Sequence, residues 1–70
     1  MITEVELGKR LRKARRKKSL SLESAAEQMP CSYSVLSAYE RGLRFPRLHF
    51  FLRMCEVYDV TPNELLERKM

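Results

Sequence analysis

Residues 21–42 read SLESAAEQMPCSYSVLSAYERG, and this stretch decides the fold of the 70-residue chain. Ser21 and Ser32 each precede a short segment with apolar residues at helical spacing. Serine is a favoured residue at the start of a helix because its hydroxyl accepts a hydrogen bond from a free backbone N–H. Pro30 disfavours a helical conformation at the residue before it, and Gly42 suits the left-handed end of a helix. The stretch therefore predicts two short helices joined by a tight turn, the first ending just before Pro30 and the second at Gly42.

The segment before this pair predicts a longer helix over residues 5–17. Its apolar stripe has the spacing i, i+4 and i+7 and consists of Leu7, Leu11 and Ala14. Thr3 is the expected N-cap residue, and Glu6 stands three residues later, as in a capping box. The stripe is narrow, so we expect only one side of this helix to be buried.

Two more helices are expected after the pair. The first covers residues 48–58, and its predicted inner face consists of Leu48, Phe51, Leu52, Cys55 and Tyr58. Phe50 is expected to point partly outward. The second begins in Thr61-Pro62-Asn63-Glu64, where threonine, proline and glutamate stand at the positions that a helix start favours. No segment has a strand pattern, so the sequence predicts an all-α fold, a compact five-helix bundle in a single domain over residues 1–70.

The chain is basic, with 14 Lys and Arg against 9 Asp and Glu and a formal net charge of +5. Residues 9–18 contain eight basic side chains and no acid, and residues 41–53 add four arginines and no acid. Such charge favours an anionic partner. No apolar run approaches the roughly 20 residues that cross a bilayer, so no membrane partner is expected. A membrane-surface helix over residues 9–18 is the rival interpretation, and the narrow apolar stripe there argues against it.

Side chains suited to catalysis or metal binding are scarce. Cys31 and Cys55 stand 24 positions apart, and His49 is the one histidine. Because a structural zinc site needs four ligands, we expect no metal. Because side chains suited to catalysis are so few, we also expect no other cofactor and no enzymatic activity. A single disulfide is arithmetically open. Two reduced thiols that act as small buried groups are the expected state, and they fit a cytosolic protein.

The second helix of the quoted stretch suits a surface that reads a nucleic acid. In a helix-turn-helix motif this helix lies in the major groove, and its first residues meet the base edges. Its inner face is apolar, with Val35, Leu36 and Tyr39. Its outer face is small or polar, with Tyr33, Ser34, Ser37 and Ala38. Ser21 and Ser32 stand at helix starts, where free N–H groups bind phosphate, and Arg41, Arg44 and Arg47 flank the helix. We therefore expect a helix-turn-helix at about residues 21–42 and double-stranded DNA as the partner.

Three segments resemble the phage-repressor/Cro-type helix-turn-helix family, also called the XRE family. They read LGKRLRKARRKKSLSLESAAEQ (7–28), SYSVLSAYERGLRFP (32–46) and LRMCEVYDVTPNELLE (52–67). The resemblance covers about residues 5–67 and implies a lambda-repressor-like bundle whose second and third helices form the motif. It implies that Arg15 pairs with Glu40, and that Tyr33, Ser34, Ser37 and Ala38 face the bases. The implied phosphate contacts are Lys18, Ser21, Ser32, Arg41 and Arg44.

The chain departs from the family pattern at three places. Leu22 stands where members commonly have a glutamine that binds phosphate and braces the reading helix. Pro30 stands in a turn that commonly contains glycine, and proline cannot adopt a positive φ. The base-facing residues include no Arg, Gln or Asn, the side chains that make paired hydrogen bonds to bases. We therefore expect modest sequence specificity that uses bound water or DNA shape.

Together these features predict a sequence-specific DNA-binding transcriptional regulator, with repression as the expected outcome, acting as a homodimer on a two-fold symmetric site. Phe50 and Leu66 are the candidate dimer contacts. The alternative on the same fold is an antitoxin or another protein-interaction module with a protein partner. We expect a cytoplasmic location in bacteria, with a bacterial or phage gene and association with the nucleoid. The sequence leaves open both a complete minimal regulator and one domain of a longer regulator.

Overall fold

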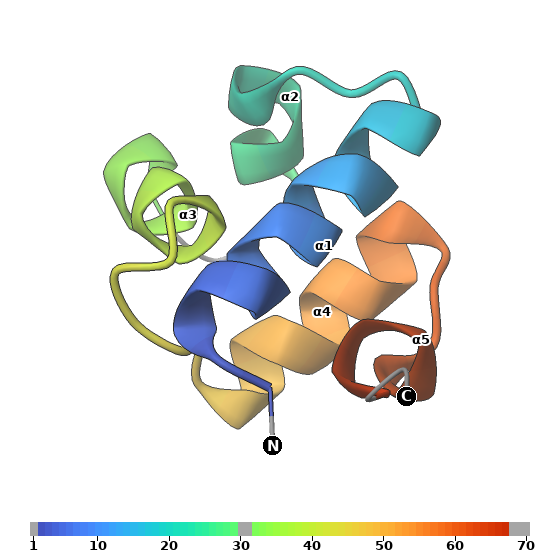
Figure 1. Ribbon diagram of the computed structural model, residues 1–70. Helices are drawn as coiled ribbons and strands as arrows, with labels where there is room; N and C mark the ends of the chain where they lie inside the picture. Colours follow the sequence, from blue (N-terminus) through green and yellow to red (C-terminus); the bar gives the residue numbers. More distant parts are fainter. Residues whose placement is uncertain (1, 30–31, 68–70) are drawn as a thin grey trace.

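The computed structural model describes residues 2–29 and 32–67. In this part of the chain there are five α-helices and no strand, so the predicted all-α bundle is confirmed. The helices are α1 (Glu4–Lys17), α2 (Leu22–Glu27), α3 (Tyr33–Glu40), α4 (Leu48–Tyr58) and α5 (Pro62–Leu66). Figure 1 shows α1 crossing the molecule, with α2 and α3 on one side and α4 and α5 on the other. The expectations about Pro30 in the turn and about the Cys31 thiol lie outside the described residues.

Four of the helices begin where the sequence predicts, at residues whose hydroxyls accept a backbone N–H bond. These residues are Thr3, Ser21, Ser32 and Thr61. At α5 the capping box is complete, because the Thr61 backbone also donates to the Glu64 carboxylate at 2.9 Å. At α1 the carboxylate of Glu6 instead accepts from the Thr3 hydroxyl, at 3.2 Å. Threonine therefore caps α1 as predicted, with a different second bond from that of a capping box.

Residues with positive φ end or connect the helices. Gly42 follows α3 with a φ of 74°, and a Cβ atom there would lie 2.6 Å from the Cα atom of Val5. Both the conformation and the lack of space therefore require glycine. Asp59 ends α4 with a φ of 54°, between the two helices expected over residues 48–58 and from Thr61 onward. Ser19, between α1 and α2, has a φ of 56°, which no pattern in the sequence indicates.

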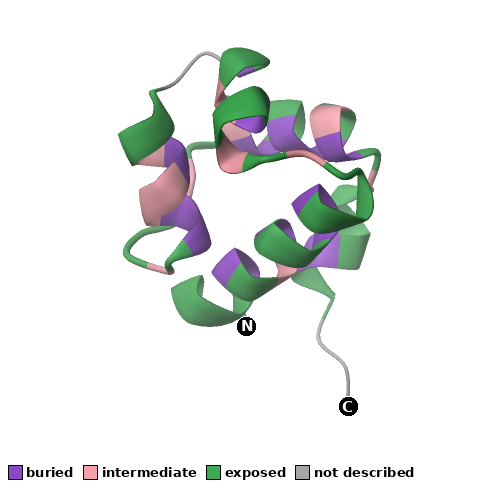
Figure 2. Cartoon of the chain, turned by 90° about the horizontal axis from the view of Figure 1, so that it is seen from above, coloured by how far each residue is buried: buried purple, intermediate pink, exposed green. Residues whose placement is uncertain are grey.

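The core lies between α1 and the other helices. Its largest fully buried side chains are Leu11, Leu36, Met54 and Tyr58. Figure 2 shows buried residues on the inward sides of the helices and exposed residues on their outward sides. The stripe predicted for α1 is buried, as is Tyr39 on α3, while Val35 beside it is partly buried. The two tyrosines expected in the core, Tyr39 and Tyr58, are therefore both there.

The inner face predicted for α4 is partly wrong. Leu48 is 72% exposed and Leu52 is 45% exposed, whereas Met54 is fully buried. The buried stripe runs through Phe51, Met54, Cys55 and Tyr58, which are spaced i, i+3, i+4 and i+7. Leu48 and Leu52 lie to one side of this stripe. Four of the five residues at positions 48–52 are leucine or phenylalanine, so the sequence pattern does not show which side of the helix faces inward. Phe50 is half-buried, in agreement with its predicted partly outward position.

A glycine sets the distance between α1 and α3. A Cβ atom on Gly8 would lie 2.6 Å from the Glu40 carbonyl oxygen and 2.8 Å from that of Tyr39. These are backbone atoms at the end of α3, so they cannot rotate away as a side chain could. Gly8 therefore allows the backbone of α1 to approach the C-terminal end of α3 closely.

Two absences hold for residues 2–29 and 32–67. Within these ranges, no group of three or more His, Cys, Asp or Glu side chains is arranged to hold a metal ion. None of the helices there combines the length and the apolar character needed to cross a bilayer.

Candidate nucleic-acid interface

The outer sides of α2 and α3 and the loop after α3 carry the residues that we group under the name reading face. It consists of Ser21, Ser32, Tyr33, Ser34, Ser37, Ala38, Arg41 and Arg44. Tyr33, with 51% exposure, and Ser34 stand in the first turn of α3 and are open to solvent. Ser37 and Ala38, one turn further on, are half-buried. The structure thus brings the four residues predicted to face bases onto one helix, and the first two are the most accessible.

The first turn of α3 has features that attract an anion. The Ser32 hydroxyl accepts the N–H of Val35 at 3.3 Å. The other N–H groups of the first turn have no partner within the helix, as in any α-helix. These groups and the helix dipole attract negative charge. No acidic side chain lies in this first turn, so nothing local opposes an incoming phosphate.

A buried ion pair holds α3 against α1. Arg15 donates from Nε to Glu40 Oε2 at 2.8 Å and from Nη2 to Oε1 at 3.0 Å. Its third bond goes from Nη1 to the Leu20 carbonyl at 2.7 Å. These bonds to Glu40 raise the pKa of Arg15, although burial acts in the opposite direction. The guanidinium therefore keeps its charge, and the pairing that the family resemblance implies is present.

The same carboxylate has a second partner, which supplies a third bond that the sequence does not indicate. The Tyr58 hydroxyl donates to Glu40 Oε2 at 3.4 Å. Tyr58 ends α4, so the Glu40 carboxylate joins α1, α3 and α4 at one point. Among the described residues no buried side-chain nitrogen or oxygen is left without a hydrogen bond. A polar cluster in which every group is hydrogen-bonded fixes the orientation of α3. Any shift of the helix would break these bonds and leave a buried charge without its partner.

An aromatic ring holds one arginine at the edge of the reading face. The guanidinium carbon of Arg44 lies 5.4 Å from the centre of the Tyr39 ring, within the range of a cation–π interaction. The Phe50 ring meets Tyr39 edge-on, with 6.1 Å between the ring centres. Arg44 is exposed apart from this contact. Its charge is therefore oriented by the fold and remains available to a partner, while Arg41 stands exposed at the end of α3.

Lys18 lies apart from the other predicted phosphate contacts. Its ammonium group is 3.9 Å from the Asp59 carboxylate, beyond the end of α4. Both side chains are exposed, that of Asp59 more than that of Lys18. The structure thus places Lys18 beside an acid on the α4 side of the molecule.

Leu22 is half-buried against the core. It follows the Ser21 cap, at the position where the family commonly has a phosphate-binding glutamine. Leu22 therefore exchanges a polar contact at the surface for apolar contact within the bundle, which stabilises α2 through burial. The first turn of α2 offers its serine cap but no side-chain amide.

These features define a helix-turn-helix protein of the lambda-repressor-like class. The sequence profile of the family described as "Helix-turn-helix domain" matches residues 6–67. The chain belongs to this family, and its relatives are regulators of the XRE type. It is 37% identical over 62 residues to the HTH-type transcriptional regulator ImmR of Bacillus subtilis, covering 89% of this chain and 49% of ImmR. It is 35% identical over 60 residues to AnsR, another HTH-type regulator of that species, covering 86% of this chain and 52% of AnsR.

Solved structures agree with this assignment. The restriction-modification controller protein C.AhdI from Aeromonas hydrophila superimposes with a TM-score of 0.83 and 35% identity, over 90% of this chain and 96% of that one. SinR, a master regulator for biofilm formation solved in complex with DNA, gives a TM-score of 0.80 and 34% identity, over 87% and 98%. The chain spans about half the length of the curated relatives that it matches.

Proposed function

We propose that this chain is a sequence-specific DNA-binding transcriptional regulator that inserts α3 into the major groove. The observation that carries the proposal is the reading face itself. A helix whose outer side is accessible in its first turn is fixed by the buried Arg15–Glu40 pair and is followed by the exposed Arg41 and Arg44. The complex of SinR with DNA supports the proposal, since its fold matches this chain closely.

We assign base contact to Tyr33, Ser34, Ser37 and Ala38. A serine hydroxyl can donate to one base and accept from another, so it discriminates less sharply than a paired contact from Arg, Asn or Gln. The tyrosine ring suits apolar contact with a thymine methyl group. Its hydroxyl group suits a hydrogen bond to a phosphate instead. Specificity in this arrangement depends on several weak contacts, with bound water and DNA shape contributing.

We assign phosphate contact to Ser21, Ser32, Arg41 and Arg44. Ser32 presents the N–H groups at the start of α3, and Arg44 is oriented by the Tyr39 ring. Lys18 is left out of this set because its ammonium lies beside Asp59. Phosphate contacts of this kind position the protein and supply affinity that does not depend on sequence.

A homodimer on a two-fold symmetric site completes the proposal. The exposed leucines of α4, Leu48 and Leu52, offer apolar surface, and Leu66 of α5 is 44% exposed. Phe50 is a weaker candidate for the dimer contact than the sequence suggests, because its ring packs against Tyr39. We assign this apolar surface to a second copy rather than to a toxin-like partner. We further propose repression as the outcome, one domain with its motif at about residues 21–42, and action in the cytoplasm at the bacterial nucleoid.

Substitutions on the reading face test this proposal. We expect Arg44→Ala to weaken binding to all duplexes and to lower the dependence of log affinity on log salt by about one unit per subunit. Ser34→Ala and Ser37→Ala should instead change which sequences are preferred. Lys13→Ala removes the same charge from the far side of α1 and serves as the control. Unchanged DNA affinity and preference in all three reading-face variants would remove the assignment of this face.

A further inference from the structure

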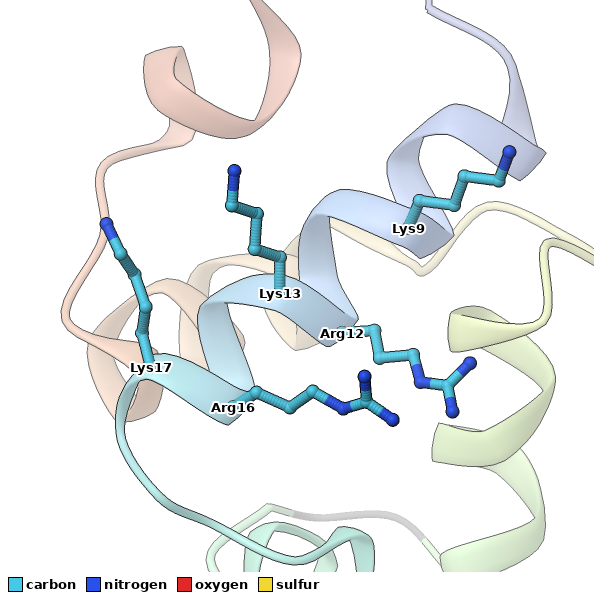
Figure 3. Close-up of a pocket in the computed structure, with 5 residues that line it drawn as sticks. All are labelled: Lys9, Arg12, Lys13, Arg16 and Lys17. Atoms are coloured by element: carbon cyan, nitrogen blue, oxygen red, sulfur yellow. The ribbon is translucent and has the colours of Figure 1, made fainter.

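The outer side of α1 carries five cations that the reading face does not use. Lys9, Arg12, Lys13, Arg16 and Lys17 line a shallow hollow of about 400 Å³, and Figure 3 shows their side chains extending from one helix. The ion pairs among the described residues involve Arg15, Lys18 and Arg53 instead, so none of the five has a carboxylate within 4.0 Å in that part of the chain. We call these five residues the α1 basic face.

This arrangement is unfavourable for the isolated protein. Lys9 and Lys13, Arg12 and Arg16, and Lys13 and Lys17 are like charges one helical turn apart, and such pairs destabilise a helix. The five side chains are exposed and make no contribution to the core. A bound polyanion would relieve this repulsion, since each phosphate would neutralise one of the charges.

The α1 basic face has two edges with different neighbours. Arg12 stands one turn after Gly8, which contacts the end of α3, and Arg16 stands one turn further on. Figure 3 shows both guanidinium groups extending toward the α2–α3 side. Lys13 and Lys17 extend the other way and line a second hollow together with Asp59, Glu64 and Glu67. The lysine edge therefore lies near acids, whereas the arginine edge faces the side of the helices that carry the reading face.

The geometry favours an extended partner over a small anion. The five cations project from a convex helix whose central N–H groups are used within the helix, so no backbone cradle exists for a small ligand. Arg12 and Arg16 are four residues apart, about 6 Å along the helix axis. One DNA strand carries a phosphate about every 3.4 Å of its axis, which gives both arginines a partner on one strand. The planar guanidinium also matches a phosphate with two parallel bonds.

We propose that Arg12 and Arg16 bind backbone phosphates of the duplex outside the half-site that α3 reads. This inference rests on the proposed function, because it requires α3 to place the protein on DNA. The arginine edge then extends the contact with the same duplex, and the lysine edge remains solvated beside its acids.

Two variants with equal charge test the inference. Arg12→Gln/Arg16→Gln and Lys13→Gln/Lys17→Gln each remove two cations from α1 and keep good helix-forming residues. Binding is measured over a range of salt concentrations on two duplexes with the sequence that the protein selects. One duplex ends at the half-sites, and the other continues by about one helical turn, roughly 10 base pairs, on each side. Circular dichroism confirms that both variants fold.

On the long duplex we expect the arginine variant to lower the salt slope by about 1.8 per subunit, from about 0.9 for each phosphate lost. The lysine variant should change the slope much less, and on the short duplex the two variants should behave alike. The inference would be overturned if both variants lowered the salt slope equally on the long duplex. It would also be overturned if the arginine variant lowered the slope more than the lysine variant on the short duplex. An unmodified protein that selects no duplex sequence would instead overturn the proposed function, so the two failures are distinguishable.

Discussion

At the scale of single residues, the position of α3 depends on the Glu40 carboxylate. It accepts two bonds from Arg15 and one from Tyr58, and both charged side chains are almost fully buried. A buried pair gives little net stability compared with apolar residues, but the loss of one partner is costly because the other charge stays buried alone. The pair therefore fixes the position of α3 more than it adds to stability.

We predict that Glu40→Ala lowers the free energy of unfolding by about 3–5 kcal/mol, because it leaves the Arg15 guanidinium buried without its carboxylate. Small domains are commonly stable by about 5–15 kcal/mol, so the variant should unfold at a much lower urea concentration. The matched control is Arg15→Met/Glu40→Leu, which removes both charges and should recover most of the loss. Glu40→Ala with the stability of the unmodified protein would contradict this prediction.

A second prediction concerns the buried Cys55 thiol. Burial raises the pKa of this thiol above its ordinary value, and Glu64 contributes in the same direction. The folded state therefore keeps its proton at pH values where the unfolded chain, with a thiol pKa of about 8.5, loses it. This contribution to stability is complete below the unfolded pKa and is lost as the pH rises toward the folded pKa.

Urea unfolding at pH values about one unit below and one unit above that unfolded pKa checks the prediction. We expect a fall in stability at the higher pH in a Cys31→Ser background, and a smaller fall when Cys55→Ala is added. Equal falls in the two proteins would show that Cys55 does not contribute.

At the scale of elements, the contact between α1 and α3 is the most constrained. We predict that Gly8→Ala destabilises the protein by about 1–2 kcal/mol, because overpacking against the carbonyls of Tyr39 and Glu40 exceeds the gain in helix propensity. Affinity for DNA should fall as well, since α3 must move away from α1. Chemical denaturation and a binding titration measure the two effects. A more stable variant with full DNA affinity would show that the approach of the two helices is not needed.

The starts and ends of the helices could be predicted from sequence because they depend on local chemistry. Ser21, Ser32 and Thr61 cap their helices as predicted, and Gly42 ends α3 in the left-handed conformation. Which side of a helix is buried depends on its neighbours, and the prediction for α4 was wrong at Leu48 and Leu52 for that reason. A glycine inside α1 was the one local sign of the close contact with α3.

The candidate site was predictable to a similar extent. The Arg15–Glu40 pair was expected only through the family resemblance, because 25 positions separate the two residues. The bonds from Tyr58 to Glu40 and from Arg10 to the Leu65 carbonyl join residues distant in sequence, and no local pattern indicates them. The same is true of Arg44 on the Tyr39 ring. Which residues contact DNA stays a prediction.

At the scale of the whole molecule, exposed cations and exposed apolar side chains share the surface. Cations are dense on α1, the loop after α3 exposes Leu43 and Phe45 beside Arg44, and α4 exposes Leu48 and Leu52. We predict that Leu48→Asp/Leu52→Asp converts a dimer into a folded monomer, since both side chains are outside the core. Sedimentation velocity measures the change, and Leu43→Asp, at another exposed leucine, should leave the dimer intact. If the unmodified protein sediments as a monomer at all concentrations, the dimer surface is wrong.

We propose that α3 reads a DNA sequence in a two-fold symmetric complex. Selection of bound duplexes from a random library near physiological salt, followed by sequencing, tests it most directly. We expect enrichment of an inverted repeat whose half-site centres lie about 34 Å apart, one turn of the duplex. Binding that is sensitive to salt but enriches no sequence would contradict the claim.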